Sequence, residues 1–117
     1  VCRLTVMQGK EYGKVYDIDA LTVRYGRKML TVGREEANGV FVDDFAESYI
    51  SRRHCTLEKI SQTLWQIRDG QWDFDNGVWK NSMNGTYVNS DRVDQNGRLL
   101  KDGDIITIGD TKLKFEL

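Results

Sequence analysis

The sequence is built from short runs in which apolar and polar residues alternate. In Leu113–Leu117, for example, apolar side chains fall at every second position and would share one face of a strand. No window of twelve residues carries the apolar spacing of an amphipathic helix. We therefore predict an all-β chain, either a sandwich or a barrel, with strands in the runs 1–7, 14–19, 29–32, 40–42, 55–60, 64–68, 86–88, 104–108 and 112–117.

Turn signals separate these runs. Asn-Gly occurs four times and Asp-Gly twice, whereas proline is absent from the sequence. Asn, Asp and Gly tolerate the positive φ of tight turns, so these pairs favour hairpin connections between strands. Two stretches, Arg34–Ile50 and Asp69–Met83, are longer and irregular, and we expect them to be loops. Long loops in compact domains often carry binding residues.

Composition narrows the classes of function. The 117 residues, 39% of them apolar, are enough for one domain spanning residues 1–117. The net charge of −1 argues against attraction of nucleic acid or a membrane surface by a global field. Because the chain starts with Val1 rather than Met, we expect it to be excised from a longer protein. Cys2 and Cys55 fall in strand-like runs and are expected to be buried thiols, and together with a single His they cannot form a zinc site.

Three segments with groups suited to phosphate lie at the ends of predicted strands. Gly33-Arg34 closes one strand, Ser51–His54 opens the next strong one, and Ser82–Thr86 opens another. Arg presents a planar fork of N–H groups, Ser a hydroxyl, and a turn its free backbone N–H groups, which together match the oxygens of a phosphate monoester. Three or four such bonds, each of roughly 1.5–3 kcal/mol, would hold a phosphopeptide at about micromolar affinity after the costs of association.

These segments, in this order, resemble the forkhead-associated (FHA) domain. The pattern is Gly-Arg, Ser-x-x-His, Ser-x-Asn-Gly-Thr-x-Val-Asn and a closing Asp-Gly-Asp-x-x-x-x-Gly, which stand here at 33–34, 51–54, 82–89 and 102–109. Each segment alone is a weak signal, whereas four in order are a strong one. The resemblance implies a two-sheet antiparallel β-sandwich of about eleven strands. It also implies loops at one end that bind phosphothreonine in an extended segment of a partner protein.

The resemblance assigns roles by position. Arg34 and Ser51 would bind the phosphate. Arg52 would line the pocket for the phosphate and the threonine methyl, and Asn84 would bind the peptide backbone. Met83 stands where many members also contact the phosphate; Met has no hydroxyl, so only its backbone N–H would serve. The positions that resemble the structural support of the family are Gly33, His54, Gly85 and Thr86, with His54 joining neighbouring loops by hydrogen bonds.

Some residues outside the pattern keep more than one interpretation. Trp65 is expected in the core. Trp72 and Trp79 lie in a segment longer than the family usually has there, and would either cap the core or form a second contact surface. Arg53 is expected to point to the opposite side of its strand from the phosphate ligands, and Lys80 would add long-range attraction to phosphate.

Three functions fit the sequence to different degrees. The first is a kinase-dependent signalling module, monomeric as an isolated domain, that binds a phosphothreonine-containing protein or peptide inside the cell, in the cytoplasm or the nucleus. The second is an FHA-fold domain used for phosphate-independent association or self-association, against which Arg34 and Ser51 argue. The third is a carbohydrate binder that stacks sugar on Trp72 and Trp79. We expect no enzymatic activity, metal or cofactor, because the single His lacks a nucleophile and an orienting partner.

Overall fold

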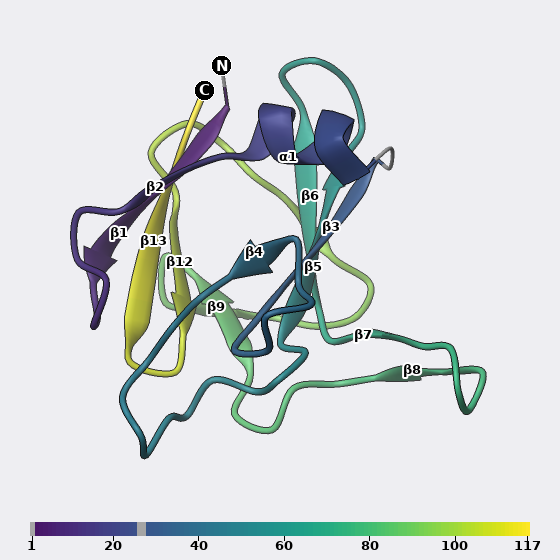
Figure 1. The fold of residues 1–117 in the computed structure, drawn as a ribbon. Helices are drawn as coiled ribbons and strands as arrows, with labels where there is room; N and C mark the ends of the chain where they lie inside the picture. Colours follow the sequence, from purple (N-terminus) through teal and green to yellow (C-terminus); the bar gives the residue numbers. More distant parts are fainter. Residues whose placement is uncertain (1, 26–27) are drawn as a thin grey trace.

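The computed structural model describes residues 2–25 and 28–117, so Val1 of the first predicted strand lies outside the described residues. Nearly all of the regular structure in the described chain is β-structure (Figure 1). In chain order the elements are β1 (Arg3–Gln8), β2 (Val15–Asp17), α1 (Ile18–Tyr25), β3 (Met29–Gly33), β4 (Val40–Phe41), β5 (Cys55–Lys59), β6 (Trp65–Asp69), β7 (Gln71–Asp73), β8 (Val78–Lys80), β9 (Thr86–Val88), β10 (Asp91–Val93), β11 (Arg98–Leu99), β12 (Ile105–Ile108) and β13 (Thr111–Glu116).

Two sheets form a sandwich. One sheet has six strands in the order β10-β9-β12-β13-β1-β2, and the other has five in the order β11-β6-β5-β3-β4. The expected two-sheet sandwich of about eleven strands is therefore confirmed. The pairings within the two sheets are antiparallel except between β3 and β4, which run parallel with Val32 beside Val40.

The apolar positions of the alternating strands form the core between the sheets. On β13, Leu113 and Phe115 point inward, and they stand opposite Val6 and Leu4 of β1. Burying each such side chain contributes about 1.5–3 kcal/mol, which fixes which face of each strand turns inward. Trp65 is fully buried, as predicted. Cys2 and Cys55 are also buried and unpaired, in agreement with the expectation of buried thiols.

The run 14–19 is not one strand, and that prediction is wrong. β2 ends at Asp17 and α1 begins at Ile18. The Asp17 carboxylate accepts the backbone N–H of Ala20 at 2.9 Å, the bond that an N-cap residue makes to a helix start. Ile18 is buried against the core, and Lys59 Nζ contacts Asp19 Oδ1 at 2.7 Å, so the helix is joined to the end of β5. The eight residues of α1 are too few for a twelve-residue window to detect.

The stretch 69–83 is also not the irregular loop that the sequence predicts. β7 and β8 form a separate antiparallel hairpin that extends beyond the sandwich at the lower right of Figure 1. At its root the buried Gln71 donates from Nε2 to the carbonyls of Val32 at 3.0 Å and Cys55 at 3.1 Å. The hairpin is therefore fixed to the ends of β3 and β5.

The three predicted phosphate-binding segments and the chain ends lie at opposite ends of the sandwich. β1 begins and β13 ends at the top of Figure 1, whereas the segments that follow β3, precede β5 and precede β9 meet at the bottom. The fold thus brings the three predicted phosphate-binding segments together, although they are far apart in the sequence.

Candidate functional site

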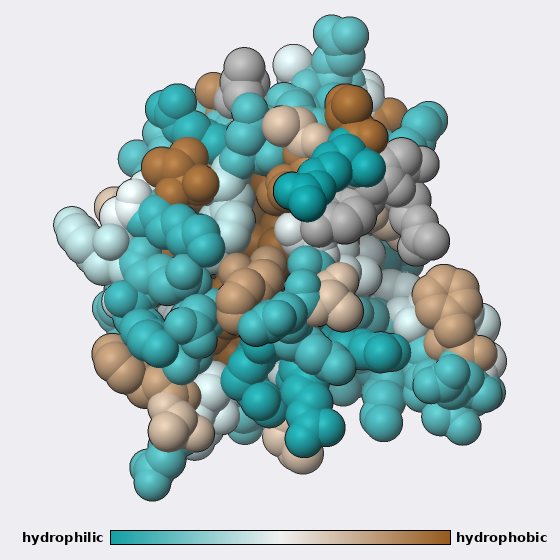
Figure 2. All heavy atoms as spheres, viewed as in Figure 1, coloured by the Kyte–Doolittle hydropathy of each residue, from teal (hydrophilic) through white to brown (hydrophobic). Residues whose placement is uncertain are grey.

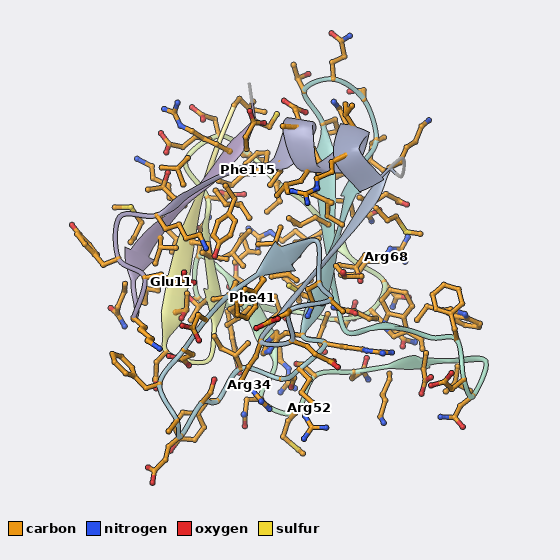
Figure 3. All side chains as sticks on the ribbon, in the orientation of Figure 1. Glu11, Arg34, Phe41, Arg52, Arg68 and Phe115 are labelled. Atoms are coloured by element: carbon orange, nitrogen blue, oxygen red, sulfur yellow. The ribbon has the colours of Figure 1, made fainter. Side chains whose placement is uncertain are left out.

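A groove of about 810 Å³ opens where these three segments meet the β7–β8 hairpin. All five predicted phosphopeptide-binding residues line it. Figure 3 shows Arg34 and Arg52 at this lower end of the sandwich, and Figure 2 shows that hydrophilic residues cover most of it. The residues in question are Arg34, Ser51, Arg52, Met83 and Asn84.

Backbone bonds hold the base of the Arg34 side chain. Its backbone N–H donates to the carbonyl of Ser51 at 3.2 Å, and its Nε–H donates to the carbonyl of Ile50 at 2.9 Å. Within residues 2–25 and 28–117, its two terminal nitrogens have no hydrogen-bond partner. The guanidinium is therefore aimed by the loop that precedes Ser51, while its outer N–H groups are free to bind an anion.

Gly33 allows the two loops to lie this close together. A Cβ at this position would collide with the backbone carbonyl of Arg52 and would lie 2.9 Å from Asn38 Nδ2. Instead, the Arg52 carbonyl accepts hydrogen bonds from Asn38 Nδ2 at 2.8 Å and from the backbone N–H of Glu35 at 3.2 Å. The Gly33-Arg34 turn and the Ser51–His54 segment are thus joined through their backbones.

The Ser51 hydroxyl is oriented by the neighbouring loop. Ser51 Oγ accepts the backbone N–H of Met83 at 2.9 Å, so its own proton is left to donate elsewhere. The expected role of the Met83 N–H as a phosphate donor does not fit this arrangement, because that N–H is already engaged by Ser51. The Met83 side chain is 85% exposed. What the structure shows for Met83 is this backbone bond to the Ser51 hydroxyl.

His54 joins two of the loops from beneath. It is fully buried; its Nδ1 accepts the backbone N–H of Ser51 at 3.0 Å, and its Nε2 lies 2.7 Å from the carbonyl of Gly85. Since Nδ1 accepts, Nε2 carries the proton and donates to Gly85, which defines a neutral imidazole. Burial lowers the pKa of His54, although the Gly85 carbonyl and the Asp69 carboxylate act in the opposite direction. Gly85 itself has a φ of 88°, which disfavours a side chain at this position.

A buried carboxylate that the sequence analysis did not identify supports the Ser82–Thr86 segment. Asp69 Oδ1 accepts the hydroxyl of Ser82 at 2.6 Å and that of Thr86 at 2.7 Å, and Asp69 Oδ2 accepts the Ser82 N–H at 3.2 Å. Asp69 is only 4% exposed. In the sequence, Asp69-Gly70 indicated only a turn, and nothing in its spacing indicated that the Asp69 side chain would turn inward.

Asn84 and Arg52 lie at the rim of the groove. Asn84 Nδ2 donates to the carbonyl of Tyr49 at 2.9 Å, and its side-chain oxygen, which has no partner among the described residues, can accept a peptide N–H. The Arg52 side chain is exposed and forms no hydrogen bond or ion pair within the part of the chain that the structure describes. Both residues therefore present unused polar groups beside Arg34 and Ser51.

The structure also places Arg53, Trp72 and Trp79, for which the sequence left an expectation or an open choice. The expectation that Arg53 points away from the phosphate ligands is wrong, because Arg53 lines the same groove and its Nε lies 3.7 Å from Glu35 Oε2. Trp79 is half-buried and donates from Nε1 to the carbonyl of Asp69 at 2.8 Å, so it covers the hairpin root. Trp72, opposite Trp79 in the hairpin, remains 45% exposed.

Within residues 2–25 and 28–117, no group of three or more His, Cys, Asp or Glu side chains is arranged so that it could hold a metal ion. The helix of the described chain, α1, has only eight residues and is too short to cross a bilayer.

Comparisons with known proteins give one family. The model of the FHA domain matches residues 30–109. A curated relative, the ABC transporter ATP-binding/permease protein Rv1747 of Mycobacterium tuberculosis, is 37% identical over 84 residues, which are 72% of this chain and 8% of that protein. The chain thus spans less than a tenth of the length of this relative.

Solved structures give the same fold. The FHA domain of the CT664 protein from Chlamydia trachomatis superposes with a TM-score of 0.74 at 18% identity, covering 99% of this chain and 96% of that one. The N-terminal FHA domain of Rad53p from Saccharomyces cerevisiae, solved in complex with a phosphothreonine peptide, superposes with a TM-score of 0.67 at 21% identity. That match covers 100% of this chain and 93% of the yeast domain.

Proposed function

The chain belongs to the FHA domain family, whose members are interaction modules, and from this membership we propose that it binds phosphothreonine-containing segments of partner proteins. The yeast domain that shares its fold was solved with a phosphothreonine peptide, which supports this choice of ligand. In this proposal residues 1–117 act as one binding domain, monomeric when isolated, in an intracellular compartment where protein kinases supply the ligand. The chain performs no catalysis of its own.

The observation that carries the proposal is that Arg34 and Ser51 are both positioned at the same groove. Both side chains are positioned by backbone bonds to neighbouring loops, and both keep their outer donors free toward one groove. A phosphate oxygen would accept the Ser51 hydroxyl while the Arg34 fork binds one or two others. Because both groups are held before the ligand arrives, little of the binding free energy is spent on ordering them.

The remaining predicted residues place the peptide around this phosphate. In this proposal Arg52 covers the phosphate and the threonine methyl, and Asn84 accepts an N–H from the peptide backbone beside them. A threonine methyl buried there contributes about 1 kcal/mol, so phosphoserine would bind more weakly than phosphothreonine. Met83 acts through Ser51, whose hydroxyl its N–H orients.

A titration with three matched peptides tests the proposal. One carries phosphothreonine, one phosphoserine and one unmodified threonine in the same sequence, and each is measured by calorimetry at low and high salt. We expect micromolar binding of the phosphothreonine peptide, weaker binding of the phosphoserine peptide, and weakening by salt. Equal affinity for the unmodified peptide would overturn the proposal and favour an FHA-fold domain that associates independently of phosphate.

A further inference from the structure

The groove extends past the phosphate-binding residues onto the β7–β8 hairpin. One continuous depression is lined by Arg34, Ser51 and Arg52 at one side and by hairpin residues, including Asp73 and Lys80, at the other. A bound peptide that places its phosphate at Arg34 therefore has a second wall available to one of its flanks. This wall is fixed, because Gln71 and Trp79 hold the hairpin root to the sandwich.

The register of the hairpin sets which face Lys80 occupies. Lys80 stands directly opposite Gln71, and directly opposed residues of an antiparallel pair point to the same face. The Gln71 side chain reaches Asn38 Oδ1 at 2.9 Å, and Asn38 in turn donates to the carbonyl of Arg52. Lys80 thus lies on the face of the hairpin turned toward the loop that carries Arg52 and Arg53.

On this part of the groove the acidic side chain of Asp73 has hydrogen-bond partners, whereas the basic side chains have few or none among the described residues. Lys80 Nζ forms no hydrogen bond or ion pair within residues 2–25 and 28–117, and only longer-range attraction links it to Asp73. The oxygens of Asp73 are already occupied by the backbone N–H groups of residues 75 and 76 and by the Asn76 side chain. Among the described residues Arg53 has only Glu35 as a partner, at 3.7 Å, with both side chains about half exposed. Two cations with spare capacity therefore line the groove, Lys80 from the hairpin and Arg53 from the Ser51–His54 segment.

We propose that Lys80 and Arg53 form a second anion subsite, which binds the carboxylate of an Asp or Glu in one flank of the phosphorylated peptide. The inference rests on the proposed function, since the phosphate at Arg34 and Ser51 places the peptide. In the bound state the ligand carboxylate pairs with Lys80 and competes with Glu35 for Arg53. The subsite makes this groove selective for phosphopeptides with an acidic flank, and it turns the hairpin into a specificity element.

A substitution scan of one phosphothreonine peptide tests the subsite. The parent peptide has Ala at each flanking position, and Glu or Lys replaces Ala at one position at a time, with affinities measured at low salt. At one position we expect the Glu peptide to bind about fivefold more tightly than the Ala peptide, and the Lys peptide to bind more weakly than the Ala peptide. The fivefold gain corresponds to ~1 kcal/mol, the upper range for an exposed ion pair. In Lys80→Ala the Glu-to-Ala ratio of affinities should fall to about one at that position.

Matched controls separate the possible failures. Lys112→Ala removes an exposed lysine from β13, on the other sheet, and should leave the Glu-to-Ala ratio unchanged. A peptide with a second phosphothreonine at the favoured position shows whether phosphate competes there. The subsite is refuted if the parent peptide binds normally but no position favours Glu, if only the second phosphate is favoured, or if Lys80→Ala keeps the preference. If the parent phosphopeptide does not bind at all, the proposed function itself fails and the subsite fails with it.

Discussion

Replacing Asp69 by Asn tests whether the buried carboxylate supports the loop that orients Ser51. The side chains have nearly the same shape, so Asp69→Asn changes charge and donor pattern without leaving a cavity. One oxygen is kept and can still accept the hydroxyls of Ser82 and Thr86. The new amide nitrogen, however, replaces the oxygen that accepts the Ser82 N–H at 3.2 Å, so two donors would face each other.

The size of the effect follows from these three bonds. Hydrogen bonds to a charged group contribute roughly 1.5–3 kcal/mol and those between neutral groups about 0.5–1.5 kcal/mol, so the two kept bonds each weaken by about 1 kcal/mol. The facing donors add a further penalty, whereas removing a buried charge offsets part of the loss. We expect Asp69→Asn to lower the free energy of unfolding by about 2 kcal/mol, which corresponds to a fall of roughly 8 °C in Tm for a domain of this size.

Chemical denaturation followed by Trp fluorescence measures this change. The matched control is Asp110→Asn, which neutralises an exposed carboxylate without a partner in the described structure and should change stability by less than about 0.5 kcal/mol. Below its Tm, Asp69→Asn should also bind phosphopeptide more weakly, because the Ser82–Thr86 segment would no longer hold the Met83 N–H on Ser51. A stability loss no larger than that of Asp110→Asn would contradict the role assigned to Asp69.

Three other predictions follow from the supporting residues. Gly33→Ala should destabilise the domain by at least ~2 kcal/mol in the same denaturation assay, because the added Cβ meets the Arg52 backbone carbonyl; a change under about 0.5 kcal/mol would show that the loops do not need this close approach. NMR titration of His54, the single histidine, should give a pKa below the ordinary value of 6.5, and a pKa at or above 6.5 would exclude the buried neutral ring. Because the unfolded state then takes up the proton first, the contribution of His54 to stability is complete above pH 6.5 and declines as the pH falls below 6.5. Burial and the nearby Asp69 carboxylate raise the pKa of the Cys55 thiol, so a thiol reagent at pH 8 should label it only as fast as the domain unfolds, and rapid labelling of the folded protein would refute its burial.

The sequence predicted those parts of the fold in which the local pattern and the tertiary packing agree. Strands such as β13 alternate cleanly, and their apolar faces are the faces that the sandwich buries. Helix α1 was not predicted because it is only eight residues long, although Asp17, three residues before Ala20, is a usable N-cap signal. The β7–β8 hairpin was not predicted because its strands have only three residues each and expose most of one face. Asn76-Gly77 between two Trp-containing runs could have indicated it.

The site was predictable in its residue types but not in its internal bonds. The motif spacing predicted Arg34, Ser51 and Asn84 as candidate site residues, and the fold places all of them at one groove. No sequence pattern reveals that the Met83 N–H bonds Ser51, because that contact joins backbone and side chain across 32 positions. The inward turn of Asp69 and the approach of Lys80 to the groove likewise depend on the hairpin, whose packing is set by tertiary contacts with β3 and β5.

The most direct test of the account compares wild type with Arg34→Ala for binding of the phosphothreonine peptide and its unmodified counterpart. Arg34→Ala removes the guanidinium together with its Nε–H bond to the Ile50 carbonyl, but it keeps the backbone bond from the Arg34 N–H to Ser51. The variant should therefore stay folded with only a modest fall in Tm, and its thermal unfolding serves as the control for folding. We expect wild type to bind only the phosphorylated peptide, and the variant to lose at least about 30-fold in affinity, about 2 kcal/mol, which is the contribution of one charge-assisted bond. Binding of the unmodified peptide by wild type, or an unchanged affinity in a folded Arg34→Ala, would contradict the account.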